Sequence, residues 1–313
     1  MNSITRRTLV AGSAAVLASG PLGAQAPAGD TAKPAPGARF AICNETFQDW
    51  PFDKAFGFAA ECGYTGIEIA PFTISNDVTD VPASKRTEVR RQAEKAGLQV
   101  IGLHWLLAKT QGFHVTSADA AVRRKTAAYL GELARFCADL GGGILVFGSP
   151  KQRDLAPGMS REEGMTHAAD VFRTLVPTLE KTNVTLALEP LSPDTTNFLT
   201  TAAEAAELAR LVGSPRCRLH LDARAMSSES VPIPELIRRH RAALEHFHAN
   251  DANGRGPGFG KVDFVPIFRA LREIGYAGWI SVEVFDEQIA PERTARESIA
   301  YMRRCWNETA GRG

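Results

Sequence analysis

The chain has 313 residues, of which 44% are hydrophobic and 23% are charged, a composition typical of a soluble globular protein large enough for one large domain. Its 36 basic and 35 acidic residues leave a formal net charge of +1, so no broad positive field is available to hold a polyanion. A nucleic-acid partner is therefore not expected.

The N-terminal residues are typical of an export signal. The arginine pair Arg6-Arg7 precedes a short apolar run of small residues, and an A-x-A cleavage motif ends at Ala26. The pair resembles a twin-arginine signal. We therefore expect a signal peptide over 1–26, a Pro- and Ala-rich linker over 27–38, and a periplasmic protein without a stable membrane span. An uncleaved, disordered N-terminus or a short membrane anchor is the alternative.

Short apolar runs then alternate with longer segments of helical periodicity over 39–308. The apolar runs predict strands at 40–43, 66–70, 98–104, 144–147, 184–189, 218–222, 244–248 and 279–283. The longer segments predict helices at 53–62, 83–96, 118–140, 160–181, 201–212, 233–242, 264–274 and 290–307. Nearly all-apolar strands indicate a parallel sheet covered by helices on both faces. Eight such repeats predict an α/β fold with a single domain, the (β/α)8 TIM barrel. An open doubly wound sheet is the alternative, but no G-x-G-x-x-G turn supports it.

Side chains that can bind metals end four consecutive predicted strands. The fifth to eighth strands end, in order, at Glu189, Asp222, His248 and Glu283. Because the carboxyl ends of barrel strands meet at one face, we expect these side chains to lie close together. Three crowded carboxylates would repel one another unless a cation neutralised them. The pattern therefore predicts one divalent metal ion held by these residues. The alternative is that one or two of them only cap strands or pair with loop arginines.

The donor types narrow the choice of ion. Oxygen-dominated coordination with one imidazole suits Mn²⁺, Mg²⁺ or Co²⁺ better than a thiolate-rich or tetrahedral zinc site. We expect Mn²⁺ first, with Mg²⁺, Co²⁺ or Zn²⁺ as alternatives.

Four longer motifs resemble a known family. They are LEPL at 188–191, HLD at 220–222, FHANDANGRGPGFGKVDF at 247–264 and WISVEVFD at 279–286. They look like the xylose-isomerase-like sugar isomerase/epimerase family, which contains the ketose 3-epimerases, and the resemblance covers essentially 39–308. It implies that the residues matching Glu189, Asp222, His248 and Glu283 bind one divalent metal. It also implies that the two glutamates act as acid and base.

Such a site would act on a 2-hydroxy ketone or 2-hydroxy aldehyde. A metal-bound carbonyl is polarised, so the neighbouring C–H becomes acidic, and the resulting enediolate carries its charge against the cation. Glu189 and Glu283 would then stand on opposite faces of this intermediate, one removing a proton and the other returning one. The prediction is a sugar isomerase or epimerase with a small-molecule substrate, and a homo-oligomer is left open.

Residues near other strand ends are candidates for binding the substrate. His104 ends the third predicted strand and Trp105 follows it; the two could bind the hydroxyls and the apolar face of a sugar. A packed-core histidine is the alternative for His104. Glu68 looks like the family's second-strand glutamate and would contact the substrate or orient a loop. Arg255, in the glycine-rich motif, is a further candidate.

Polar residues around the predicted ligands are assigned supporting positions. Asn250 and Asp251 follow His248 and are expected to brace the metal ligands or the loop that carries Arg255. His220 and His246, each two residues before a predicted ligand, are expected to face the helices.

The residues expected to grip the substrate depart from the ketose 3-epimerase pattern. Ala225 stands where those enzymes have a histidine, Thr195 where they have a glutamate, and Gly254 where they have an arginine. Lys151 and Arg153, on the loop after the fourth strand, could hold an anionic group, although two charges on a loop are more often solvated. The metal quartet is thus intact, while the usual free-ketose substrate is in doubt.

Three other functions remain as alternatives. A metal-dependent lyase could use the same intermediate to expel a β-leaving group from a 3-keto-glycoside. An apurinic-site endonuclease has a related barrel but gathers more histidines and several metals. A non-catalytic sugar-binding protein would keep its affinity without the two glutamates.

Overall fold

The computed structural model describes residues 37–286 and 288–310. The expected signal peptide and all but the last two residues of the expected linker lie outside this range. Within it, parallel strands close into a barrel in sequence order, with β8 paired back to β1. They are β1 (Arg39–Cys43), β2 (Gly66–Ile69), β3 (Gln99–Leu103), β4 (Ile144–Phe147), β5 (Thr185–Leu188), β6 (Cys217–Asp222), β7 (Leu244–Ala249) and β8 (Trp279–Val282). The predicted (β/α)8 barrel is confirmed.

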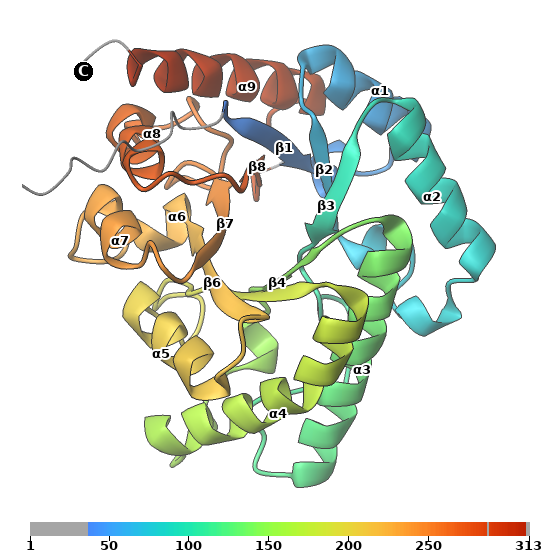
Figure 1. The fold of residues 1–313 in the computed structure, drawn as a ribbon, viewed down its shortest axis with the longest axis vertical. Helices are drawn as coiled ribbons and strands as arrows, with labels where there is room; N and C mark the ends of the chain where they lie inside the picture. The colour runs from blue at the N-terminus through green and yellow to red at the C-terminus, as the bar shows by residue number, and fades with distance from the viewer. Residues whose placement is uncertain (1–36, 287, 311–313) are drawn as a thin grey trace, which may run out of the picture. The chain divides into compact units, whose positions relative to one another are not determined.

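Helices surround the strands as a ring, as Figure 1 shows. They are α1 (Phe52–Cys62), α2 (Ala83–Lys95), α3 (Ala120–Leu140), α4 (Arg161–Thr182), α5 (Ala202–Val212), α6 (Ala223–Met226), α7 (Ile233–Arg239), α8 (Phe264–Glu273) and α9 (Pro291–Glu308). All eight predicted helices are present. The short α6 was not predicted, and it follows β6 directly because Asp222 caps it by accepting a hydrogen bond from the Ala225 N–H.

Local sequence signals explain where the longer helices begin and end. Thr201 caps α5 by accepting a hydrogen bond from the Glu204 N–H, and Gly213 ends this helix with a φ of 72°, which glycine adopts without strain. Asp119 caps α3 in the same way as Thr201 caps α5. These signals fix the helix that precedes β6 and the helix that precedes β4, and so help to set where those strands start.

The barrel interior differs from the usual one. Most of the apolar core lies between the strands and the helices. Inside the barrel, Ala41, Ile101 and Trp279 form a small separate apolar cluster. The interior also holds a group of buried polar side chains in mutual contact: Cys43, Glu68, His104, His220, His246, His248 and Ser281. Barrels of this kind normally fill the interior with branched apolar residues, so this polar group requires an explanation other than stability.

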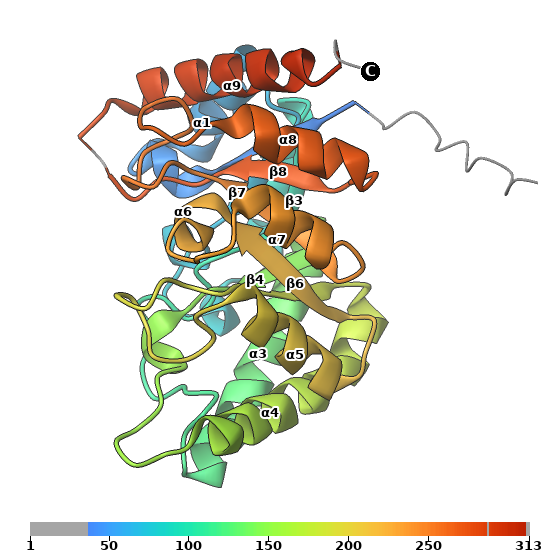
Figure 2. The same cartoon turned by 90° about the vertical axis from the view of Figure 1, so that its left-hand side faces the viewer.

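The carboxyl ends of the strands define one face of the barrel. Loops that leave these ends, including the segment with α6, lie together on one side in Figure 2. Among the residues that the structure describes, no helix is long and apolar enough to cross a membrane.

Candidate metal centre

The four predicted metal ligands meet at the carboxyl face of the barrel. Glu189 directly follows β5, Asp222 ends β6, His248 lies in β7 and Glu283 directly follows β8. All four are buried, with exposed fractions between 0% and 6%. Potential ligand atoms of Glu189, Asp222 and His248 lie within 4.8 Å of one another, and Oε2 of Glu283 is 3.0 Å from Nδ1 of His248. The structure therefore brings the quartet together, while its role as a ligand set stays a prediction.

The carboxylates of this cluster oppose one another's ionisation. Burial and the charges of Glu283 and Asp222 raise the pKa of Glu189 well above 4.5. Burial and Glu283 also raise the pKa of Asp222, from 3.8 to about 6. A divalent cation would relieve both effects because it favours the ionised carboxylates. This conflict, together with the buried oxygen and nitrogen donors, fits a metal ion.

His248 lies between two carboxylates. Its Nε2 is 3.2 Å from both oxygens of Glu68, and its Nδ1 faces Glu283. Burial alone would lower the pKa of His248, but these two charges raise it well above 6.5. A positive charge at this point is therefore strongly favoured, and a metal ion held by His248 would supply it in place of a proton.

Glu68 supports His248 and does not reach solvent. It is completely buried, and it also bonds Nε2 of His246 at 2.9 Å. Burial opposes its ionisation, but the charges and hydrogen bonds of His246 and His248 hold the pKa of Glu68 well below 4.5. The carboxylate of Glu68 thus holds the ring of His248, a predicted metal ligand, while its predicted contact with a substrate stays a prediction.

The expectation that His220 and His246 face the helices is wrong. Residues two apart in a strand point to the same face, so both histidines share the interior with Asp222 and His248. Nε2 of His220 lies 3.7 Å from Oε1 of Glu189. Burial and the nearby histidines lower the pKa of His220 well below 6.5, so this pair is not an ion pair at neutral pH.

The two predicted substrate residues that follow β3 differ in burial. Nε1 of Trp105 donates a 2.9 Å hydrogen bond to Oε1 of Glu283, and Nε2 of His104 lies 2.8 Å from Oε2 of Glu45. Trp105 has a φ of 53°, a left-handed conformation that costs energy for a non-glycine residue. His104 is 1% exposed, so it is a buried partner of Glu45. Trp105 is the better placed of the two to meet a ligand.

Asn250 and Asp251 brace the site in two different ways. Nδ2 of Asn250 donates a 2.6 Å hydrogen bond to Oδ2 of Asp222, which orients a predicted ligand. Oδ1 of Asp251 accepts hydrogen bonds from the N–H groups of Ala252 and Lys261, which closes the glycine-rich loop. A Cβ at Gly260 would lie 2.0 Å from Oδ1 of Asp251, so this position requires glycine.

Arg255 is held at the edge of the site. Its Nε donates a 2.7 Å hydrogen bond to Asp286, and its Nη2 donates one of 3.3 Å to Gln288. Both partners belong to the loop after β8. The guanidinium therefore ties two rim loops together, and its predicted contact with a substrate stays a prediction.

Sequence reasoning missed how Arg153 acts. Arg153 is completely buried and donates hydrogen bonds of 2.7 Å to the main-chain oxygen of Glu189 and 3.0 Å to that of Phe147. Burial lowers its pKa to about 10, so it keeps its charge at neutral pH beside Glu189. The expectation of a loop cation free to bind an anion or solvent is wrong for Arg153, whereas Lys151 is exposed.

Gly148 gives Glu189 its space. A Cβ at Gly148 would lie 1.7 Å from Oε2 of Glu189. The glycine directly after the predicted fourth strand was the available signal for this close approach, although the sequence does not say which side chain approaches it.

Two hollows lie at opposite ends of the barrel. A groove of about 1060 Å³ runs along the carboxyl face and is lined by aromatic side chains. They are Phe47, Trp50, Phe52, Phe72, Trp105 and Phe285. Because Trp105 bonds Glu283, this groove opens beside the predicted site.

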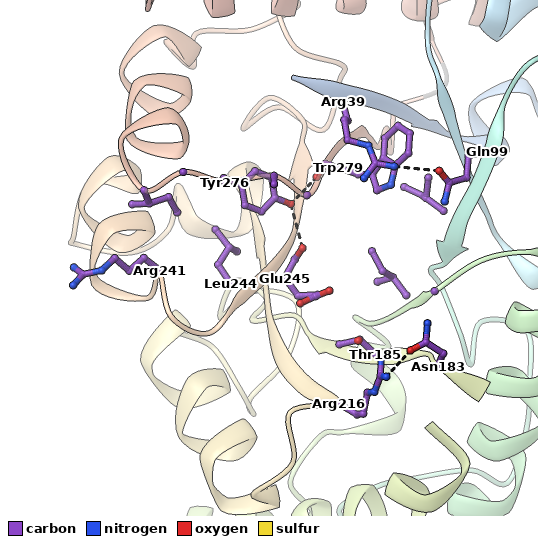
Figure 3. Close-up of a pocket in the computed structure, with 17 residues that line it drawn as sticks. Arg39, Gln99, Asn183, Thr185, Arg216, Arg241, Leu244, Glu245, Tyr276 and Trp279 are labelled. Carbon is purple, nitrogen blue, oxygen red and sulfur yellow. Dashed lines mark hydrogen bonds between the residues drawn. The ribbon is translucent and has the colours of Figure 1, made fainter. Parts of the chain in front are cut away.

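A smaller hollow of about 530 Å³ lies at the amino ends of the strands. Its polar side chains already bond one another: Arg39 to Gln99 and Arg216 to Asn183, as Figure 3 shows. Catalytic groups of such barrels gather at the other face. The groove beside Trp105 is therefore the candidate substrate site.

Comparisons with known proteins agree with this fold. A protein family described as Xylose isomerase-like TIM barrel matches residues 56–305. An L-ribulose 3-epimerase of Mesorhizobium japonicum is 31% identical over 196 residues, which cover 61% of this chain and 64% of that protein's length.

Solved structures share the fold at lower identity. A D-psicose 3-epimerase in the presence of D-fructose has a TM-score of 0.76 at 20% identity, with 86% of this chain and 99% of that chain covered. A 3-keto-D-glucoside 4-epimerase of E. coli has a TM-score of 0.73 at 21% identity, with 86% and 100% covered. These relatives are named epimerases, which is consistent with a carbohydrate epimerase. The chain belongs to the xylose isomerase-like TIM barrel family.

Proposed function

We propose that the protein is a divalent-metal-dependent carbohydrate epimerase or isomerase that moves a proton at a carbon next to a carbonyl group. The observation that carries this proposal is the convergence of Glu189, Asp222, His248 and Glu283 in one buried cluster beside an open groove. Three acidic side chains buried together have no stabilising role without a cation. The names of the relatives support a sugar as the substrate.

Glu189, Asp222, His248 and Glu283 would hold the ion. A bound divalent cation would polarise the substrate carbonyl and offset the negative charge that develops when the adjacent C–H loses its proton. The protein's own contribution is to keep these donors fixed. Glu68 orients His248, Asn250 orients Asp222, and Gly148 leaves room for the Glu189 carboxylate.

Glu189 and Glu283 differ in a way that suits an acid and a base. Burial opposes ionisation of Glu283, but His248 and its hydrogen bond lower the pKa of this group below 4.5, whereas burial and the neighbouring carboxylates raise that of Glu189. Two carboxyl groups whose pKa values are pushed apart are the expected arrangement for a base and an acid. We therefore assign proton removal to Glu283 and proton return to Glu189.

Trp105 and Arg153 position these two residues. The Nε1–H of Trp105 holds Oε1 of Glu283 at the rim, beside the groove. Arg153, on the loop after β4, holds the main-chain oxygen of Glu189. The carboxyl group of Glu283 and the main chain of Glu189 are thus each held by a donor that lies outside the predicted ligand set.

A second candidate function is elimination from a 3-keto-glycoside. The groove of about 1060 Å³ lies at the upper end of the size range of small-molecule pockets, roughly 300–1,000 Å³, and its aromatic rings suit the apolar faces of a second sugar or an aglycone. In this reaction Glu283 removes the proton beside the carbonyl and a C=C bond forms. The β-linked C–O bond breaks, and Glu189 protonates the departing oxygen. The substitutions at Thr195, Ala225 and Gly254 favour a substrate other than a free ketose.

One experiment separates the two reactions. The metal-loaded protein is incubated in D₂O with ketoses, hydroxypyruvate and 3-keto-glycosides, and the products are followed by NMR. Deuterium at the carbon beside the carbonyl without release of an aglycone supports the epimerase. Release of the aglycone supports the lyase. Neither exchange nor release from any compound, under conditions in which the ion is bound, contradicts both proposals. Glu189→Gln and Glu283→Gln serve as inactive controls.

Export is a separate proposal. We infer from Arg6-Arg7 and the apolar run after them that the protein is exported to the periplasm by a twin-arginine route. Fractionation of cells that express the full chain tests this directly. Replacement of both arginines by lysine should retain the protein in the cytoplasm, and unchanged recovery in the periplasm would argue against this route.

A further inference from the structure

One histidine in the barrel interior has no hydrogen-bond partner. His220, in β6, has an exposed fraction of 0%, and neither Nδ1 nor Nε2 has a hydrogen-bond partner. Among the described histidines it is the one with both ring nitrogens buried and unpaired. Buried polar atoms are almost always hydrogen-bonded, because leaving them unpaired is costly. An exception inside a packed barrel requires a specific reason.

The position of His220 supplies that reason. A ring nitrogen of His220 lies within 4.8 Å of potential ligand atoms of Glu189, Asp222 and His248. Its Nε2 is 3.7 Å from Oε1 of Glu189, too far for a hydrogen bond, and its ring centroid is 4.2 Å from that of His248. An unpaired imidazole is thus aimed at the cluster of predicted metal ligands.

A purely structural role explains His220 poorly. The interior of such a barrel is normally filled by branched apolar side chains, which leave no polar atom unpaired. Leucine or isoleucine at this position would fill comparable space without unpaired nitrogens. His246, the equivalent residue on β7, does have a partner, since its Nε2 bonds Glu68. The difference between the two histidines points to a ligand for His220.

We propose that His220 is an additional ligand of the metal centre, so that imidazoles from β6 and β7 bind the ion together with the carboxylates of the predicted set. This inference rests on the proposed metal-dependent function. It changes the donor set from one imidazole and three carboxylates to two imidazoles and three carboxylates.

The changed donor set alters the expected ion. Imidazole ligands suit Zn²⁺, Cu²⁺, Fe²⁺ and Ni²⁺, whereas sites rich in carboxylates suit Mg²⁺ and Mn²⁺. With a second nitrogen donor, the site would prefer Zn²⁺ to Mg²⁺ and Mn²⁺, and Co²⁺ also binds such donors more tightly than Mn²⁺ does. This replaces the expectation, based on the four strand ends alone, that Mn²⁺ comes first.

The test measures metal binding in His220→Leu, with His240→Leu as the control. His240 ends α7 and lies outside the cluster. In His220→Leu we expect Zn²⁺ and Co²⁺ affinity to fall about 10- to 100-fold or more, the loss seen even for groups that only orient a ligand, while Mg²⁺ affinity changes little. His240→Leu should match the wild type for every ion.

Stability without metal gives an independent readout. In the presence of a chelator, His220→Leu should raise the Tm by roughly 2–4 °C, because it removes an unsatisfied buried group from a domain of this size. Added Zn²⁺ should then raise the Tm of the variant less than that of the wild type. A residue with a merely structural role would lower the Tm in both conditions.

X-ray absorption of the Zn²⁺- or Co²⁺-loaded wild type gives a test that needs no variant. Two imidazoles bound to the ion support the inference. One imidazole, together with unchanged Zn²⁺ affinity in His220→Leu, overturns the role of His220 but leaves the metal-dependent function intact. If the wild type binds none of these ions, the proposed function itself fails, so the two failures are distinguishable.

Discussion

Nε2 of His248 lies 3.2 Å from each carboxylate oxygen of Glu68, beneath the predicted metal ligands. The same carboxylate bonds His246 at 2.9 Å. A completely buried glutamate between two histidines stabilises the barrel interior only as long as its charge is matched. Its position indicates that Glu68 orients the ring of His248.

Replacement of Glu68 by glutamine should weaken metal binding. We expect the dissociation constant of the preferred ion to rise about 10- to 100-fold, because the ring of His248 loses its carboxylate partner. Unfolding free energy should fall by about 3 kcal/mol. Competitive metal titration and urea unfolding measure the two effects. Glu132→Gln is the control, since Glu132 pairs with Arg135 on the surface of α3, and equal effects in both variants would contradict the role of Glu68.

Arg153→Met should destabilise the fold. The substitution leaves the main-chain oxygens of Glu189 and Phe147 without their donor and removes the charge beside Glu189, so we expect a loss of about 2–4 kcal/mol in unfolding free energy. Lys151→Met changes the same charge on the exposed part of the same loop and should cost about 0.5 kcal/mol or less. Urea unfolding of the two variants compares them, and similar midpoints would show that Arg153 does not anchor Glu189.

Trp105→Phe should slow the reaction and leave the fold intact. The ring still packs beside Phe72 and Phe285, but the hydrogen bond to Glu283 is lost. A hydrogen bond to a charged group is worth about 1.5–3 kcal/mol, so kcat should fall roughly 10- to 100-fold. The rate of deuterium exchange into the substrate is the measurement. Trp50→Phe is the control. Trp50 lines the same groove but makes no hydrogen bond to Glu283, so this substitution should change KM more than kcat.

Metal affinity should depend on pH. Because burial and Glu283 raise the pKa of Asp222 to about 6, a proton competes with the ion there, and the raised pKa of Glu189 adds to this competition. Affinity should therefore increase as the pH rises through about 6, with release of protons on binding. Calorimetry in buffers of different ionisation enthalpy measures both quantities. Constant affinity between pH 5 and pH 8 would argue against Asp222 as a ligand.

The same pKa shift affects stability without metal. Since the pKa of Asp222 is about 6 in the folded chain and 3.8 ordinarily, the folded state keeps a proton that the unfolded state has lost. Ionised Asp222 thus costs stability as the pH rises from about 4 to about 6. Relative to the wild type, Asp222→Asn should gain up to about 3 kcal/mol across this window. Urea unfolding in chelator at the two pH values measures the difference, and no relative gain would contradict the shift.

The barrel fold could be predicted from the sequence because the strand pattern is repeated eight times along the chain. Each of the eight runs has the apolar composition of a strand buried on both faces, and the rule that active groups lie at strand ends then selects Glu189, Asp222, His248 and Glu283. The short α6 was missed because it depends on one cap, the side chain of Asp222, which had been assigned only to the metal.

The supporting residues could not be predicted with the same success. His220 and His246 were assigned to the wrong face, although the two-residue period of a strand places them with Asp222 and His248. Arg153 was missed for a different reason. Its partners are main-chain oxygens after β4 and β5, a contact between neighbouring strands that no local pattern records.

Metal content is the most direct test of the account. The folded protein, purified without chelator and dialysed against Zn²⁺, Co²⁺, Mn²⁺ or Mg²⁺, should retain about one ion per chain by elemental analysis, and Asp222→Asn should retain much less. If the wild type retains none of these ions, the buried carboxylates have another purpose, and the proposed chemistry is contradicted.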